Sequence, residues 1–162
     1  MYKAVWGKIR VMNAKGDLAA LYGRDFFAWT QRASELLRKG CFAEADIQHV
    51  AEEIADMGKE RQHALKSQTR RLLVHLLKWQ FQPERRSRSW RVSMANARVE
   101  ISDVLEESPS LKATTPDLPA DVYQNAVKLT TLETGLPRKS FPDSCPYTFD
   151  QMMEDDFLPG GE

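Results

Sequence analysis

The residues best suited to chemistry gather in one central stretch, residues 43–81, which contains all three histidines. In two places an acid is followed three positions later by a histidine: Asp46 precedes His49, and Glu60 precedes His63. Residues three apart share a face of a helix, and Glu-x-x-His elements of this kind bind metal ions in helical bundles. With one further carboxylate from the same arc, the candidate metal ligands are His49, Glu53, Glu60 and His63.

A shared metal site needs more than this spacing. The two elements lie fourteen residues apart, which is about 21 Å along a straight helix. They share an ion only if the chain folds back or a second subunit contributes. Neighbouring acids such as Asp56 and Glu60 repel each other at four-residue spacing, but the cost is only about 0.2–0.5 kcal/mol per pair. Because charged runs on helices are usually solvated, an acidic surface is favoured over a metal site, and we expect no cofactor.

A basic cluster occupies the end of the same stretch and the residues after it. Between Lys59 and Arg91 the chain has ten Lys and Arg residues and only two acids. Guanidinium groups bind phosphates through paired hydrogen bonds, and tryptophans such as Trp79 and Trp90 can stack on unpaired bases. The candidate residues for binding nucleic acid or another anion are Arg70, Arg71, Lys78, Arg85, Arg86, Arg88 and Arg91. The alternative, favoured by the neutral total charge, is that these cations form internal salt bridges and both tryptophans belong to the core.

A third candidate is a ribonuclease of the helical kind with an Arg-x4-His element, which Arg70 and His75 formally match. On a regular helix these two side chains point about 140° apart, whereas Arg71 and His75 share a face. A short pattern of this kind is weak. A buried His75 that is hydrogen-bonded within the core is therefore the favoured interpretation.

Composition limits the remaining classes of function. The chain has 162 residues, with 23 Lys and Arg and 23 Asp and Glu, so its formal net charge is zero. Cys41 and Cys145 stand in separate contexts and form neither a disulfide framework nor a metal-ligand pair, which suits a cytoplasmic protein. No run approaches the roughly 18 apolar residues of a membrane span, and the first sixteen residues lack the apolar region of a signal peptide. Serine-nucleophile, phosphate-loop and dinucleotide-binding motifs are absent.

Helices are the elements that must position these residues. Apolar residues recur at helical spacing on one stripe of the central stretch, and we expect Ile54, Leu72 and Trp79 to be buried. One rigid helix over residues 44–81 would be about 57 Å long, whereas a compact chain of this length has a radius of gyration of about 15 Å. Since the stripe weakens at Gly58 and glycine is a poor helix former, we expect a break or kink there.

Further helices flank the central stretch. Asp25 can cap a helix that Gly40 ends. The other predicted helices begin after Ser87 or Ser89, at about Ala120, and after the capping-box residue Thr148. The sequence therefore predicts an all-α, single-domain bundle of four or five main helices with a short helical, proline-rich C-terminal tail. The domain is expected over residues 17–159, and residues 1–16 are a candidate disordered extension.

Several segments resemble a known family. In chain order they are LYGRDFFAWTQRASELLRKG, AEEIADMGKE, HLLKWQFQPERRSRSW, SPSL and TGLPRKSFPDSCPYTFDQMMEDDFLP. The resemblance covers roughly residues 18–159, and the third segment is long and unusual enough to be specific. These segments are similar to the bacterial family catalogued as domain of unknown function number twenty-nine. The resemblance implies a small, mostly helical bacterial protein and brings no activity with it.

Taken together, these patterns favour an interaction or regulatory module with a basic surface that binds anions or nucleic acid. The expected partners are nucleic acid or an acidic protein, with a homodimer as a further option and no membrane. The alternative is a metal-dependent or ribonuclease-like enzyme that uses the histidine and carboxylate ridge, or Arg71 with His75. No catalytic residue is assigned.

Overall fold

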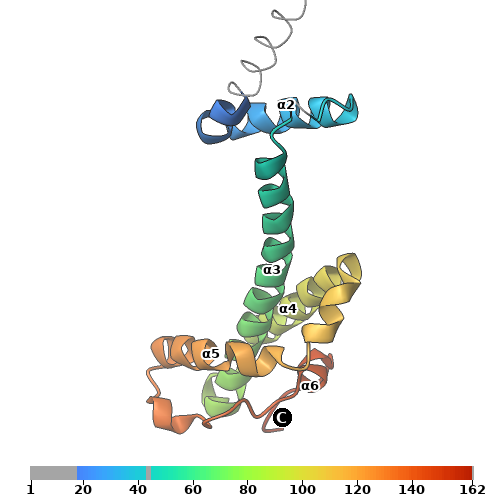
Figure 1. The fold of residues 1–162 in the computed structure, drawn as a ribbon. Helices are drawn as coiled ribbons and strands as arrows, with labels where there is room; N and C mark the ends of the chain where they lie inside the picture. The colour runs from blue at the N-terminus through green and yellow to red at the C-terminus, as the bar shows by residue number, and fades with distance from the viewer. Residues whose placement is uncertain (1–17, 43–44, 162) are drawn as a thin grey trace, which may run out of the picture. The chain divides into compact units, whose positions relative to one another are not determined.

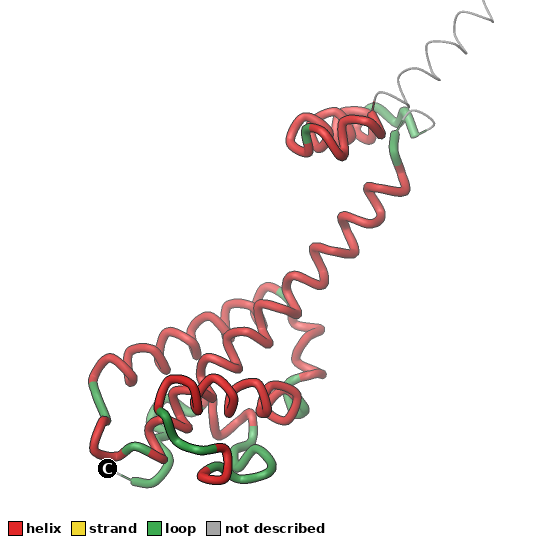
Figure 2. The backbone as a smooth tube through the Cα atoms, turned by 90° about the vertical axis from the view of Figure 1, so that its left-hand side faces the viewer, coloured by secondary structure: helices red, strands yellow, loops and turns green. Residues whose placement is uncertain are grey.

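The computed structural model describes residues 18–42 and 45–161, and every regular element in these residues is helical (Figure 1, Figure 2). The candidate disordered extension, residues 1–16, lies outside them. Helical turns at residues 18–24 come first. The α-helices that follow are α2 (Phe26–Arg38), α3 (Ile47–Phe81), α4 (Arg88–Glu107), α5 (Leu118–Thr134) and α6 (Phe149–Met153). Short 3₁₀ turns connect them at η1 (Pro83–Arg85), η2 (Pro109–Thr114) and η3 (Arg138–Ser140). The predicted all-α class is confirmed.

Contacts divide the chain into two compact units, with the boundary inside α3. The N-terminal unit ends at Gly58 and the C-terminal unit begins at Lys59. The sequence predicts one helical domain over residues 17–159, and that domain organisation stays a prediction. Each unit has its own buried cluster of apolar side chains.

The N-terminal unit is built around α2. The Asp25 side chain caps this helix by accepting a hydrogen bond of 2.9 Å from the Ala28 amide, as its sequence position predicts. Apolar residues three and four positions apart on α2 then face a small core. The buried members of that core are Leu18, Trp29, Ala33, Leu36 and Ala45.

Helix α3 is 35 residues long and runs without interruption through Gly58, so the expected break is wrong. A glycine in a helix interior reduces the stability of the helix by only about 1 kcal/mol relative to alanine. The hydrogen bonds of the flanking helical turns are sufficient to offset this cost. Leu72 and Trp79 are buried as predicted, but Ile54 is 65% exposed, so its predicted burial is wrong. Helical spacing aligns Ile54 with the apolar stripe, but burial also needs an element packed over it, and the N-terminal core extends along α3 only to Val50.

No described helix is long and apolar enough to cross a membrane.

The C-terminal unit packs the second half of α3 against α4, α5 and the tail. Its core joins α3 residues such as Leu72 and Leu76 to Ile101 of α4 and Tyr123 of α5, all nearly inaccessible to solvent. Ser87 is the N-cap of α4 and accepts a hydrogen bond from the Trp90 amide, which resolves the choice between Ser87 and Ser89. This packing places the first turn of α4 next to the end of α3 and the C-terminal segment.

The tail after α5 is fixed by its own caps. Gly135 ends α5 in the left-handed conformation, with φ 76°. Thr148 and Gln151 form the predicted capping box at the start of α6. Buried aromatic residues then attach the tail to the core of the C-terminal unit, so that the residues after α6 pass along α4 (Figure 1).

Candidate functional site

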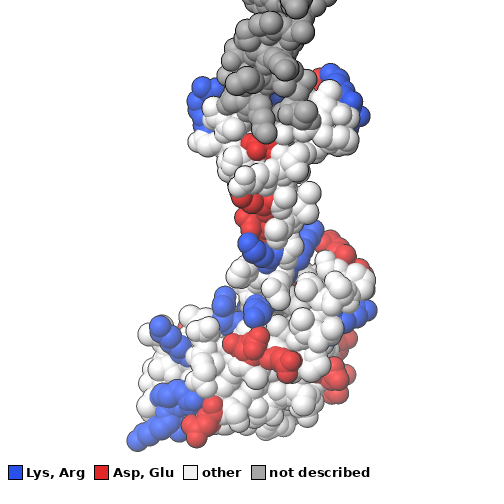
Figure 3. All heavy atoms as spheres, viewed as in Figure 1, with Lys and Arg blue, Asp and Glu red and all other residues white. Residues whose placement is uncertain are grey.

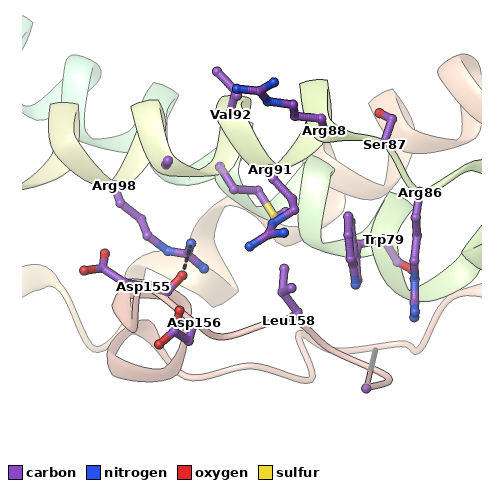
Figure 4. Close-up of a pocket in the computed structure, with 13 residues that line it drawn as sticks. Trp79, Arg86, Ser87, Arg88, Arg91, Val92, Arg98, Asp155, Asp156 and Leu158 are labelled. Carbon is purple, nitrogen blue, oxygen red and sulfur yellow. Dashed lines mark hydrogen bonds between the residues drawn. The ribbon is translucent and has the colours of Figure 1, made fainter.

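An open groove of about 960 Å³ lies within the C-terminal unit, between the first half of α4, the end of α3 and the segment that follows α6 (Figure 4). Arg86, which follows η1, and the arginines of α4 supply its positive charges. Two aspartates after α6 supply its negative charges. The residues that line it are Trp79, Arg86, Ser87, Arg88, Arg91, Val92, Met94, Ala95, Arg98, Asp155, Asp156, Leu158 and Gly161.

The α4 side of the groove follows from helical spacing. Arg88, Arg91, Ala95 and Arg98 stand three or four positions apart, and with Val92 they occupy an arc of about 120° on the helix. Figure 4 shows Arg91 and Arg98 extending toward the C-terminal segment, while Arg88 and Val92 lie at the outer rim. Arg88 and Arg91 are exposed, and within residues 18–42 and 45–161 neither forms a hydrogen bond or an ion pair.

The opposite side of the groove is attached to α4 by Arg98. This side chain is only 6% exposed. It donates to the main-chain carbonyls of Met152, Asp155 and Phe157 at 2.9, 3.0 and 3.0 Å. Burial lowers the pKa of the Arg98 guanidinium, and the negative charges of Asp155 and Asp156 partly offset that effect. Because all three hydrogen bonds end on carbonyls, the two carboxylates stay exposed in the groove.

The floor of the groove is formed by Trp79, whose ring is covered by Arg86. The Arg86 guanidinium carbon lies 5.0 Å from the ring centroid, and Arg86 Nε donates to the Trp79 carbonyl at 3.1 Å. The indole nitrogen of Trp79 has no hydrogen-bond partner among the described residues. Arg86 therefore has a structural role in the floor, and the Trp79 ring does not present an open face for a base.

The other predicted basic residues lie outside the groove. Lys78 forms an ion pair of 2.7 Å with Glu133 and lies 4.7 Å from the centroid of the Trp90 ring. Arg70 donates to the Ser67 hydroxyl at 3.5 Å, at the long limit of a hydrogen bond. Arg71 and Arg85 are exposed. Of the seven predicted anion-binding residues, the groove brings together Arg86, Arg88 and Arg91.

The surface outside the groove has mixed charge. On the face drawn in Figure 3, basic and acidic side chains both occur across the C-terminal unit. Lys66 adds a second cross-helix ion pair, 3.0 Å from Asp121 of α5. Lys66 and Lys78 are therefore paired with acids of α5, as the alternative interpretation of internal salt bridges expects, whereas Arg88 and Arg91 are not.

The structure places the four predicted metal ligands in different surroundings. His49 is hydrogen-bonded through Nδ1 to the Asp46 carboxylate, and its ring stacks on Tyr22 with centroids 4.0 Å apart. Glu53 accepts a hydrogen bond of 2.5 Å from the Tyr22 hydroxyl. The other two ligands, Glu60 and His63, are exposed residues of the C-terminal unit. In the described part of the chain, no group of three or more His, Cys, Asp or Glu residues is arranged to hold a metal ion.

His75, the centre of the ribonuclease-like hypothesis, is partly buried on α3. Its Nδ1 lies 2.9 Å from the carbonyl of Arg71, one turn earlier. Burial lowers the pKa of His75. Arg71 thus contacts His75 through its main chain. The sequence interpretation places His75 within the core, whereas the side chain is only partly buried and bonds within its own helix.

Sequence reasoning missed Arg98, Asp155 and Asp156 as groove residues. A signal for Arg98 was available, because it stands four residues after Met94 and three before Ile101, on the apolar stripe of its helix. A charged residue in such a position must find partners when it is buried. The two aspartates belong to an acidic C-terminal segment whose charge is opposite to that of the basic cluster, so attraction between the two segments is expected from the sequence. No spacing rule indicates which arginines the aspartates face.

Comparisons with known proteins agree with the family resemblance and add no activity. The search of curated proteins and the search of solved structures each gave no match. A family model described as "Domain of unknown function DUF29" matches residues 21–158, which is most of the chain. The chain therefore belongs to the DUF29 family.

Proposed function

We propose that the protein is an interaction module whose contact surface is the groove beside α4, where Arg88 and Arg91 bind an anionic group of a macromolecular partner. The partner's group is a carboxylate or a phosphate, because a guanidinium donates to either through two parallel hydrogen bonds. The first turn of α4 adds main-chain amides and the positive end of a helix of 20 residues.

One observation carries this proposal: Arg88 and Arg91 are the cations of the groove without a protein partner in the described chain. Arg86 is bound to Trp79, and Arg98 is bound to three carbonyls. Two exposed guanidinium groups, one helical turn apart and beside an accessible groove, retain their full capacity to donate hydrogen bonds.

The environment of the two arginines favours a local anion over a long polyanion. Asp155 and Asp156 line the same groove, and like charges placed opposite each other weaken association. The tryptophan rings that could stack on bases are covered by Lys78 and Arg86. A nucleic acid that ran along the groove would meet repulsion at one end and would find no open stacking platform.

The proposal is tested by binding of short glutamate peptides and of short-chain inorganic polyphosphate to the full chain at several salt concentrations. We expect binding that weakens as salt is added, since the contacts are exposed ion pairs. The double substitution Arg88→Gln with Arg91→Gln should reduce affinity about tenfold, because two charge-assisted contacts of roughly 0.7 kcal/mol each are lost.

A matched control removes the same charge elsewhere. Lys112 and Lys128 are exposed and do not line the groove. Lys112→Gln with Lys128→Gln should therefore leave affinity near that of the unaltered chain. Absence of any salt-dependent binding, or an equal loss in both double variants, would overturn the proposal.

A further inference from the structure

The groove carries charges of opposite sign at its two ends, with apolar side chains between them. Arg88 and Arg91 lie toward the start of α4. Arg98 lies further along the same helix, and Asp155 and Asp156 of the C-terminal segment lie beside it. Val92, at the outer rim with Arg88, is 49% exposed (Figure 4). Met94, Ala95 and Leu158 also line the groove. A ligand that fits must match a positive end, an apolar middle and a negative end.

The register of α4 gives the separation of the α4 residues at the two ends of the groove. Arg98 lies seven residues after Arg91 and ten after Arg88, which is about 10 to 15 Å along a helix that rises 1.5 Å per residue. Arg98 fixes the main chain of Asp155 by a hydrogen bond of 3.0 Å. The α4 residues that mark the two ends are therefore held at a separation that exceeds the size of a single amino acid. An extended peptide covers it with about three to five residues at 3.3 Å per residue.

We propose that the groove binds a polypeptide segment in which an acidic and a basic residue, about three to five positions apart when extended, flank an apolar residue. This inference rests on the proposed function and names its partner. The acidic residue binds Arg88 and Arg91, the basic residue binds Asp155 and Asp156, and the apolar residue covers Ala95 and Leu158.

Charge complementarity decides between a peptide and a nucleic acid. A nucleic acid has negative charges only, so phosphates near Asp155 and Asp156 meet like charge at close range. A peptide with both signs gains an ion pair at each end and buries apolar surface between them. Arg98 keeps the aspartate end in place, because its hydrogen bonds fix the main chain and leave both carboxylates free to pair.

The test is selection of a random peptide library, with peptides about twelve residues long, on the immobilised full chain. Enriched peptides should contain an acidic and a basic residue on either side of an apolar one. Asp155→Asn with Asp156→Asn should weaken the enriched peptides about two- to fivefold, as expected for exposed ion pairs. The same double variant should bind polyphosphate and a single-stranded RNA oligonucleotide more tightly than the unaltered chain does.

A control variant separates local from general charge effects. Glu100 and Asp103 are exposed residues of α4 that do not line the groove, so Glu100→Gln with Asp103→Asn changes the net charge equally. We expect this variant to bind the enriched peptides as the unaltered chain does. Circular dichroism of every variant checks that the helices are retained.

Enrichment of peptides with acidic residues only, or RNA binding tighter than that of any selected peptide, would overturn the peptide inference. It would also fail if Asp155→Asn with Asp156→Asn had no more effect than the control. In each case, loss of polyphosphate binding in the Arg88 and Arg91 variant would still support the proposed function. If neither peptides nor polyanions bind, both are overturned.

Discussion

Arg98 of α4 donates a hydrogen bond of 2.9 Å from Nε to the main-chain carbonyl of Met152, 54 positions later in the chain. The same guanidinium binds the carbonyls of Asp155 and Phe157. We expect Arg98→Met to destabilise the chain by about 3 kcal/mol, because charge-assisted hydrogen bonds are lost and carbonyls are left unsatisfied. Urea unfolding monitored by circular dichroism measures the change.

Arg98→Lys provides an informative comparison, since lysine keeps the charge but cannot reach three carbonyls with one planar group. We expect it to recover only part of the lost stability. Arg91→Met on the same helix removes an exposed arginine and should change stability by less than about 0.5 kcal/mol. Equal effects of Arg98→Met and Arg91→Met would contradict the structural role of Arg98.

Gly58 and Gly135 should respond in opposite directions to substitution by alanine. Gly58 lies inside α3, and no atom of a neighbouring residue lies within 4 Å of an added Cβ, so Gly58→Ala should stabilise the chain by about 0.5–1 kcal/mol. Gly135 has φ 76°, so Gly135→Ala should destabilise it by about 1 kcal/mol. Thermal unfolding of the two variants in parallel tests the pair, and a loss of stability in Gly58→Ala would show that α3 needs glycine there.

Tyr22 should titrate abnormally. Its hydroxyl donates to the Glu53 carboxylate at 2.5 Å. That hydrogen bond, together with burial and the negative charges of nearby acids, raises the pKa of Tyr22 from 10.0 to about 12. Since the neutral form is favoured in the folded chain, the stability that Tyr22 contributes is complete below pH 10.0 and is lost as the pH rises toward 12.

Tyrosinate absorbance, recorded as a difference between the unaltered chain and Tyr22→Phe, gives the titration of this residue. Glu53→Gln should move the midpoint down toward the value of a free tyrosine, because the carboxylate is the main cause of the shift. A midpoint that stays unchanged in Glu53→Gln would contradict the hydrogen bond.

Cys145 should react slowly with thiol reagents. It is partly buried, and burial raises the pKa of its thiol, an effect that the main chain of Tyr147 offsets only in part. The thiolate is the reactive form, so at neutral pH we expect alkylation of Cys145, measured by mass spectrometry in a Cys41→Ser variant, to be slower than alkylation of glutathione. A faster rate would indicate an activated thiol.

Helices whose apolar face packs within one unit could be predicted well from the sequence. Leu72 and Trp79 are buried because α4 and α5 pack over the same stripe that their spacing defines. The cap at Asp25 and the capping box at Thr148 were predictable because they depend on local hydrogen bonds only.

Long-range relationships were not predictable in the same way. The spacing that buries Leu72 applies equally to Ile54, and what differs is the presence of a neighbouring helix, which no periodicity reports. The candidate site has the same limitation. Arg88 and Arg91 were identifiable as cations of one cluster. Which cations of that cluster form ion pairs depends on the fold, which brings acids of α5 near Lys66 and Lys78. Asp155 could not be placed opposite them without the hydrogen bonds of Arg98.

The attachment of the C-terminal segment by Arg98 has a thermodynamic consequence for recognition. Ordering a flexible side chain or loop on binding costs roughly 0.5–1.5 kcal/mol for each group immobilised. Because the carbonyls of Asp155 and Phe157 are already anchored to α4, that entropy has been lost on folding. A preorganised groove of this kind should exchange partners with little structural rearrangement, and its affinity should depend mainly on the ordering of the incoming chain.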